Sequence, residues 1–108
     1  MDKVSVQAIY YVFNTLWRGP GQTTAMDADS LAYSIGWSRG YTRKVLEDMY
    51  KLGLVFTVPE RPEIEKEIPI LWALTKEGMD LADKVFKNIK QWREIIISYL
   101  KSKGVEHE

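Results

Sequence analysis

The chain has 108 residues, 45% of them hydrophobic and 12% aromatic, which is enough for one packed core. Its 15 basic and 15 acidic side chains give a net charge of zero, so a globally positive field for nucleic acid is excluded and any such binding has to rest on local charge. The absence of cysteine excludes disulfides, thiolate catalysis and cysteine-ligated zinc, and the lack of a signal peptide or a long apolar run predicts a cytoplasmic protein with no membrane contact.

The first predicted helix begins after Ser5, whose hydroxyl can cap it, and ends at Gly19-Pro20-Gly21. Apolar residues recur along it every three or four positions, which indicates a helix with one buried face. We interpret its aromatic residues as core packing in preference to the lining of a ligand cavity. The apolar stripe consists of Val6, Ile9, Tyr10, Phe13, Leu16 and Trp17.

Two further helices follow in quick succession. Either Thr24 or Asp27 can cap a short helix that ends at Gly36 and buries Ala28, Leu31, Ala32 and Ile35. Ser38 can cap the next helix, with Trp37 in place for a hydrophobic staple, and Gly53 ends it. The buried stripe of that helix is predicted to be Val45, Leu46 and Met49, with Tyr50 or Leu52.

Residues 54–58 and 68–74 each alternate with a period of two around a turn-rich insert, which predicts a two-stranded hairpin. Pro59, Pro62 and Pro69 cannot donate ladder hydrogen bonds. We therefore expect an irregular tip, with strand pairing confined to the base of the hairpin.

The last predicted helix begins after the capping residue Thr75 and continues to about residue 101, roughly 39 Å at 1.5 Å per residue. Apolar residues follow a heptad-like spacing along it, and they cover more of its surface than packing on one neighbour requires. We expect part of the helix to pair with a second copy of the chain, through Val85, Ile89, Trp92, Ile96 and Tyr99. The polar residues 102–108 are expected to form a flexible tail.

This layout resembles the winged helix-turn-helix transcriptional regulators, with the MarR and PadR groups of small archaeal and bacterial regulators nearest. The segments that carry the resemblance are Asp29-Ser30-Leu31-Ala32, Ser38 to Leu46, Met49 to Val55 and Leu74 to Ala82. The fold it implies is mainly α with a small β-hairpin (α+β). We expect one domain over residues 1–108, with a helical core and wing at 6–74, a C-terminal dimerisation helix at 75–101 and the tail at 102–108.

The resemblance implies that the helix beginning after Ser38 enters the major groove of double-stranded DNA. On this basis Arg39, Tyr41 and Arg43 are predicted to read bases, and Ser38, Thr42 and Lys44 to contact the DNA backbone. The expected function is that of a homodimeric, sequence-specific DNA-binding regulator, with no catalysis and no cofactor. The alternative is that three cations on a helix face are simply solvated.

The predicted wing departs from the resemblance because its tip has four glutamates (Glu60, Glu63, Glu65 and Glu67) against Arg61 and Lys66. Phosphates repel carboxylates, so we expect only Arg61 to reach DNA from this segment. A solvated loop that protects the hairpin edge is one interpretation of the acidic tip. The other is a docking site, which makes a protein-interaction module that uses the wing or the C-terminal helix the second hypothesis for function.

No catalytic or metal-binding constellation can be assembled from the sequence. The single histidine, His107, lies in the predicted tail, and Gly19-Pro20-Gly21 lacks the lysine that a phosphate-binding loop needs. Asp27 and Asp29 lie where carboxylates favour a helix start, so paired acid-base catalysis is not indicated. No small-molecule effector is identified.

Overall fold

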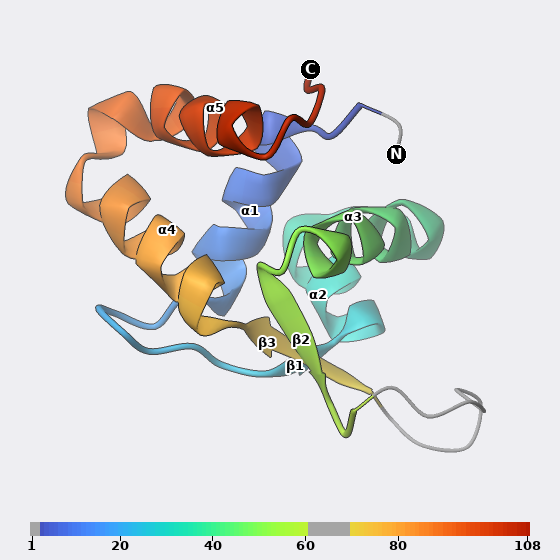
Figure 1. Cartoon of the computed structure of the whole chain (residues 1–108). Coiled ribbons are helices and arrows are strands. Elements are labelled where there is room, and N and C mark those ends of the chain that lie inside the picture. Colours follow the sequence, from blue (N-terminus) through green and yellow to red (C-terminus); the bar gives the residue numbers. More distant parts are fainter. Residues whose placement is uncertain (1–2, 61–69) are drawn as a thin grey trace.

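The computed structural model describes residues 3–60 and 70–108. Helices dominate, and three short strands lie at one edge of the helical body (Figure 1). The elements in chain order are α1 (Val6–Leu16), β1 (Met26–Asp27), α2 (Ala28–Ile35), α3 (Arg39–Lys51), β2 (Val55–Val58), β3 (Leu71–Leu74), α4 (Lys76–Lys87), the short 3-10 helix η1 (Ile89–Gln91) and α5 (Trp92–Ser102).

Four helices begin at a residue whose side chain accepts a hydrogen bond from a backbone N–H three positions later. These caps are Ser5, Asp27, Ser38 and Thr75. Each one satisfies an amide that the first helical turn leaves without a partner. The predicted helix starts are therefore confirmed, and the choice between Thr24 and Asp27 is settled for Asp27.

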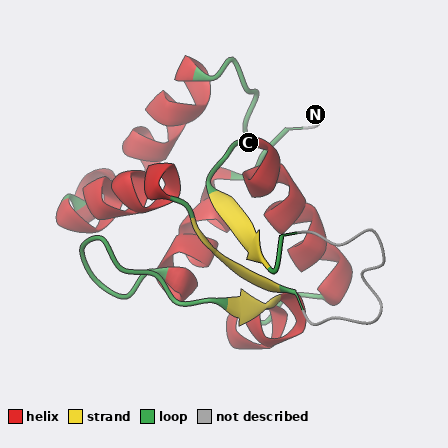
Figure 2. Ribbon diagram, turned by 60° about the horizontal axis from the view of Figure 1, so that its bottom comes forward, coloured by secondary structure: helices red, strands yellow, loops and turns green. Residues whose placement is uncertain are grey.

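The three strands form an antiparallel sheet in the order β1-β3-β2 (Figure 2). In the hairpin, Val55 pairs with Leu74 and Thr57 with Trp72. This confirms the predicted wing base. On the other side of β3, Met26 pairs with Trp72, so the residues just before α2 form a third strand that the sequence did not predict.

The core lies between α1 and the surrounding helices, which Figure 1 shows grouped around it. The side chains of Ile9, Phe13 and Leu16 on α1 are completely buried, as are Leu31 on α2 and Leu46 on α3. The predicted stripes of these helices therefore meet in one hydrophobic cluster. This packing holds α2 and α3 in a fixed relation to the rest of the chain.

The prediction of one continuous helix from residue 76 to 101 is wrong. Helix α4 ends at Lys87, and Asn88 has φ −130° and ψ 60°, outside the helical region. The chain then reverses, so that α5 packs against both α4 and α1 (Figure 1). Folding back buries apolar surface that a straight helix would leave in water.

The reversal changes the predicted dimer seam. Val85 and Ile96 are completely buried inside the protomer, so their assignment as dimer contacts is wrong. Tyr99 is half-buried, and its hydroxyl lies 3.1 Å from the carbonyl oxygen of Leu52 within the same chain. Ile89 is 47% exposed and Trp92 is half-buried. Of the five residues, Ile89 is exposed, and Trp92 and Tyr99 are partly so.

The prediction of a flexible tail at 102–108 is also wrong. The end of the chain lies beside its beginning, where Val4 pairs with His107 in a parallel bridge. The N–H of Val4 donates to the carbonyl of Glu106, and the N–H of Glu108 donates to the carbonyl of Val4, each at 3.0 Å. These backbone hydrogen bonds order the segment, which composition alone does not reveal. None of the described helices combines the length and apolar character needed to cross a membrane.

Candidate nucleic-acid interface

The start of α3 presents polar and basic side chains to solvent. The hydroxyl of Ser38 accepts a hydrogen bond from the N–H of Tyr41 at 3.2 Å, which fixes the first turn. Gly40 leaves open space, since a Cβ added there would meet nothing within 4 Å. Helix N-terminal amides and cations at such a position attract phosphate. The exposed residues here are Ser38, Arg39, Gly40, Tyr41, Arg43 and Lys44.

Thr42 does not belong to this exposed group. Its side chain is completely buried, and its hydroxyl donates to the carbonyl of Ser38 at 2.8 Å. It lies on the face that also buries Val45, Leu46 and Met49. The prediction that Thr42 contacts the DNA backbone is therefore wrong for this structure, because a helical face that packs on the core cannot also face a ligand.

The cations on α3 differ in their ion pairs. Nε of Arg39 lies 3.5 Å from a carboxylate oxygen of Asp29 on α2, and Nζ of Lys44 lies 3.6 Å from Asp48 one turn further along α3. Within the described part of the chain, Arg43 makes no ion pair and is exposed. Helix α3 carries four basic and two acidic residues in a chain of zero net charge, so the required charge is local.

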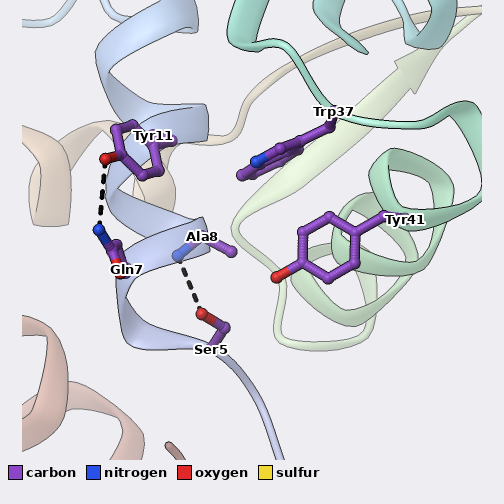
Figure 3. A pocket seen from close by; sticks show the side chains of 6 residues that line it. All are labelled: Ser5, Gln7, Ala8, Tyr11, Trp37 and Tyr41. Carbon is purple, nitrogen blue, oxygen red and sulfur yellow. Dashed lines mark hydrogen bonds between the residues drawn. The ribbon is translucent and has the colours of Figure 1, made fainter.

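Tyr41 is held by a neighbouring aromatic side chain. Its ring meets that of Trp37 edge to face, with centroids 5.0 Å apart, and Trp37 contacts Tyr11 of α1 in the same way at 6.2 Å (Figure 3). Trp37 therefore packs beside the helix start, but its partner Tyr41 is the third helical residue, one position before the residue that the predicted hydrophobic staple would use. Tyr41 is 39% exposed, so it presents an edge to solvent while the contact restrains its rotamer.

A shallow hollow lies between these rings and the start of α1. Its volume is about 160 Å³, below the range of about 300 to 1,000 Å³ that is usual for small-molecule sites. No charged side chain lines it, and its effect is to leave one side of Tyr41 open (Figure 3). The lining residues are Ser5, Gln7, Ala8, Tyr11, Trp37 and Tyr41.

Of the wing, the structure describes the base but not the tip. Glu60 is described and exposed, whereas Arg61, the predicted DNA contact of the wing, lies outside the described residues together with the other glutamates of the tip. The roles predicted for Arg61 and for the acidic tip therefore stay predictions. At the base, Phe56 and Val58 face outward with exposed fractions of 41% and 44%.

Two exposed residues of α2 were missed in the sequence. Asp29 was interpreted as favourable for the start of α2, yet it also contacts Arg39. Tyr33 on α2 is 91% exposed. The signal for Tyr33 was available, because the apolar residues 28, 31, 32 and 35 place it off the buried face of that helix. The signal for Asp29 was not, since its partner belongs to a different helix.

A second surface is aromatic and lies where α1, α4 and α5 meet. The rings of Trp17 and Phe86 stack with centroids 4.5 Å apart, and those of Tyr10 and Trp92 lie 4.4 Å apart. All four residues are half-buried, and Ile89 is exposed on the turn between α4 and α5. Much of this aromatic surface is thus used within the protomer, which agrees with the interpretation of the helix-one aromatics as packing residues.

Over residues 3–60 and 70–108, no three histidine, cysteine or acidic side chains lie close enough together to hold a metal ion. Glu77 on α4 is a carboxylate with two side-chain partners, Tyr99 and Lys103. A hydrogen bond from Lys103, followed by one from Tyr99, lowers the pKa of Glu77 below its ordinary value. The contacts of Glu77 with Tyr99 and Lys103 join α4 to the end of α5, away from the exposed start of α3 (Figure 1).

Comparison with known proteins supports the fold. The chain is similar to two structures of ZitR from Lactococcus lactis, a mutant (17% identity, TM-score 0.54) and the wild type in complex with DNA (14% identity, TM-score 0.52). The match to the mutant spans 95% of this chain and 62% of the ZitR chain, and the match to the wild type spans 96% and 76%. RV1404 from Mycobacterium tuberculosis matches at 17% identity and a TM-score of 0.50, over 91% of this chain and 56% of that one.

The fold is a winged helix-turn-helix. In it, α2 and α3 form the helix-turn-helix and β2 and β3 form the wing. The chain spans less than two thirds of the length of the ZitR mutant and RV1404 structures. No protein-family model matches the sequence, and no curated protein sequence does either.

Proposed function

We propose that this protein binds double-stranded DNA as a transcriptional regulator, with the start of α3 in the major groove. The observation that carries the proposal is the exposed first two turns of α3, where Arg39, Arg43 and Lys44 surround a capped helix N-terminus on a winged helix-turn-helix fold. The wild-type ZitR structure in complex with DNA, which has a similar fold, supports the same choice.

The exposed residues have distinct parts in this proposal. Arg43, which has no ion pair among the described residues, is available to a phosphate or to a guanine edge. Lys44 lies beside Asp48 and acts as a point charge for a phosphate. Tyr41, restrained by Trp37, offers its ring edge and hydroxyl to a base or a phosphate oxygen. Ser38 serves first as the cap that holds these groups in place.

The proposal includes a homodimer that pairs through the turn between α4 and α5. Ile89 is exposed there, and the half-buried Trp92 and Phe86 lie on the helices that flank it. Covering such apolar surface by a second copy removes it from water, which favours association. A two-fold arrangement can place two copies of α3 about 34 Å apart, one turn of the DNA helix.

A salt titration of binding to random duplex DNA, followed by fluorescence anisotropy, tests DNA binding without a known target site. We expect binding at about 50 mM salt that weakens steeply as salt rises, with a log-log slope of about five if six phosphates are contacted by the dimer. The variant Arg39→Ala with Arg43→Ala should bind at least tenfold more weakly, because two phosphate- or base-contacting cations are lost.

The matched control is Lys84→Ala with Lys101→Ala, which removes two exposed cations from α4 and α5. The control should bind nearly as well as wild type if α3 is the contact surface. Equal losses in both double variants would mean that net charge alone governs binding. Absence of binding at low salt would overturn the proposal and favour a protein partner instead.

A further inference from the structure

Arg39, the first residue of α3, is engaged by a carboxylate of the preceding helix. Its Nε lies 3.5 Å from Asp29 on α2, and the two side chains are 79% and 49% exposed. An ion pair this exposed contributes little to stability, about 0 to 1 kcal/mol. Both partners lie at the surface proposed above to meet DNA, so the consequence of their contact concerns binding.

A carboxylate at this position opposes DNA binding in two ways. It repels phosphates within a screening length of about 8 Å at physiological salt, and it competes with them for the guanidinium of Arg39. Asp29 is not the capping residue of α2, since Asp27 accepts the capping hydrogen bond from the N–H of Ser30. Asp29 supports the helix start only through its charge in the first turn, and among the described residues its side chain makes an ion pair with Arg39.

We propose that Asp29 is a specificity determinant of the DNA-binding surface. Its ion pair with Arg39 keeps the guanidinium from backbone phosphates, and a base edge with two acceptors replaces Asp29 as the partner of Arg39. The inference rests on the proposed function. A guanine edge can accept two hydrogen bonds from one guanidinium in the plane of the base pair, whereas a random sequence offers that edge only by chance. Competition from Asp29 therefore weakens random binding more than binding to the preferred sequence, and the ratio of the two rises.

The other cations of α3 do not have this arrangement. Lys44 pairs with Asp48 on its own helix, and the Asp48 side chain is only 15% exposed, so it stays out of reach of DNA. Arg43 has no ion pair among the residues that the structure describes. Arg43 and Lys44 therefore contribute mainly to general affinity, whereas the Asp29–Arg39 pair sets discrimination.

The variant Asp29→Asn tests the proposal, because it keeps the side-chain shape and removes the charge. Its matched control is Asp80→Asn, which removes the same charge from an exposed ion pair with Lys76 on α4, where the distance is 3.2 Å. Figure 1 shows α4 across β2 and β3 from α3. At about 100 mM salt, Asp29→Asn should bind random duplex DNA about three- to tenfold more tightly than wild type, and Asp80→Asn less than twofold more tightly.

A double-mutant cycle separates competition for Arg39 from simple repulsion of DNA. Arg39→Ala should cost at least threefold more affinity for random DNA in the Asp29→Asn protein than in wild type, because Asp29 no longer occupies the guanidinium. Affinity for a sequence enriched from a random duplex library should rise less in Asp29→Asn than affinity for random DNA does. The specificity ratio of this variant therefore falls.

The outcomes distinguish this inference from the proposed function. If wild type binds and the Arg39, Arg43 double variant does not, DNA binding by α3 stands. An Asp29→Asn protein that then behaves like Asp80→Asn, or a cycle with additive effects, would overturn the role of Asp29 alone. If wild type does not bind DNA at low salt, both the function and this inference fall.

Discussion

Replacing Gly78 with alanine adds one methyl group at the closest approach between α4 and the start of the wing. A Cβ at this position would lie 2.0 Å from the carbonyl oxygen of Leu54 and 3.0 Å from its carbonyl carbon. Carbon and oxygen atoms at ordinary close contact are about 3.3 Å apart. The two segments would thus have to separate by about 1 Å, and the obstacle is main chain, which cannot rotate away as a side chain can.

Two opposing effects decide the outcome. Alanine is favoured over glycine in a helix by about 1 kcal/mol. Overpacking costs about 1 to 3 kcal/mol, and here it also disturbs the Leu54 carbonyl, which accepts a hydrogen bond from the N–H of Thr75 at 3.0 Å. Since the clash is with backbone, we expect the cost to dominate and the free energy of unfolding of Gly78→Ala to fall by about 2 kcal/mol.

Urea denaturation followed by circular dichroism measures this change, and Gly40→Ala is its matched control. Gly40 is also helical, but nothing lies within 4 Å of a Cβ placed there, so alanine should leave the protein as stable or raise the free energy of unfolding by up to about 1 kcal/mol. If Gly78→Ala proved as stable as Gly40→Ala, the close packing of α4 against Leu54 would be refuted.

Three further predictions concern the C-terminal helices. Ile89→Glu should convert the proposed dimer into a folded monomer, as measured by sedimentation. Ile96→Glu should unfold the chain, because Ile96 is completely buried, and a folded Ile96→Glu protein would contradict the fold. Tyr99→Phe removes the hydroxyl that lies 3.0 Å from Glu77 and 3.1 Å from the Leu52 carbonyl oxygen. This variant should lower the free energy of unfolding, measured by urea denaturation, by about 1 kcal/mol. An unchanged free energy of unfolding would contradict these contacts. Hydrogen bonds from Lys103 and Tyr99 lower the pKa of Glu77 in the folded state, so its contribution to the free energy of unfolding is present above the ordinary pKa of 4.5 and is lost as the pH falls through the lower folded pKa. Urea unfolding at a series of pH values should therefore show that Glu77→Gln loses less stability in acid than wild type does. Equal losses of stability in the two proteins would count against this linkage.

Local signals were read correctly from the sequence where a few neighbouring residues decide the structure. The capping residues Ser5, Ser38 and Thr75 and the two strands of the wing base are of this kind. Each depends on a side chain and the amide three residues away, or on alternation within one strand. The exposed basic start of α3 follows from the same local reasoning.

The errors arose where distant segments decide. The apolar residues from Val85 to Tyr99 keep a helical spacing across Asn88, although the helix itself ends there. The chain reverses at Asn88 because α5 packs on α1 and α4, which the spacing does not reveal. The two-residue strand β1 is too short to produce a periodic signal. Thr42 is buried because the inner face of α3 extends one turn further than its apolar residues indicate.

The most direct test of the central claim is to map the contact surface in solution. Amide chemical shifts of the isotopically labelled protein should be recorded by NMR during titration with a short random DNA duplex. We predict that the largest shift changes cluster at residues 38–44, at the start of α3, with smaller ones at the beginning of α2. Changes concentrated on α4 and α5 instead, or no changes at low salt, would contradict DNA binding by α3.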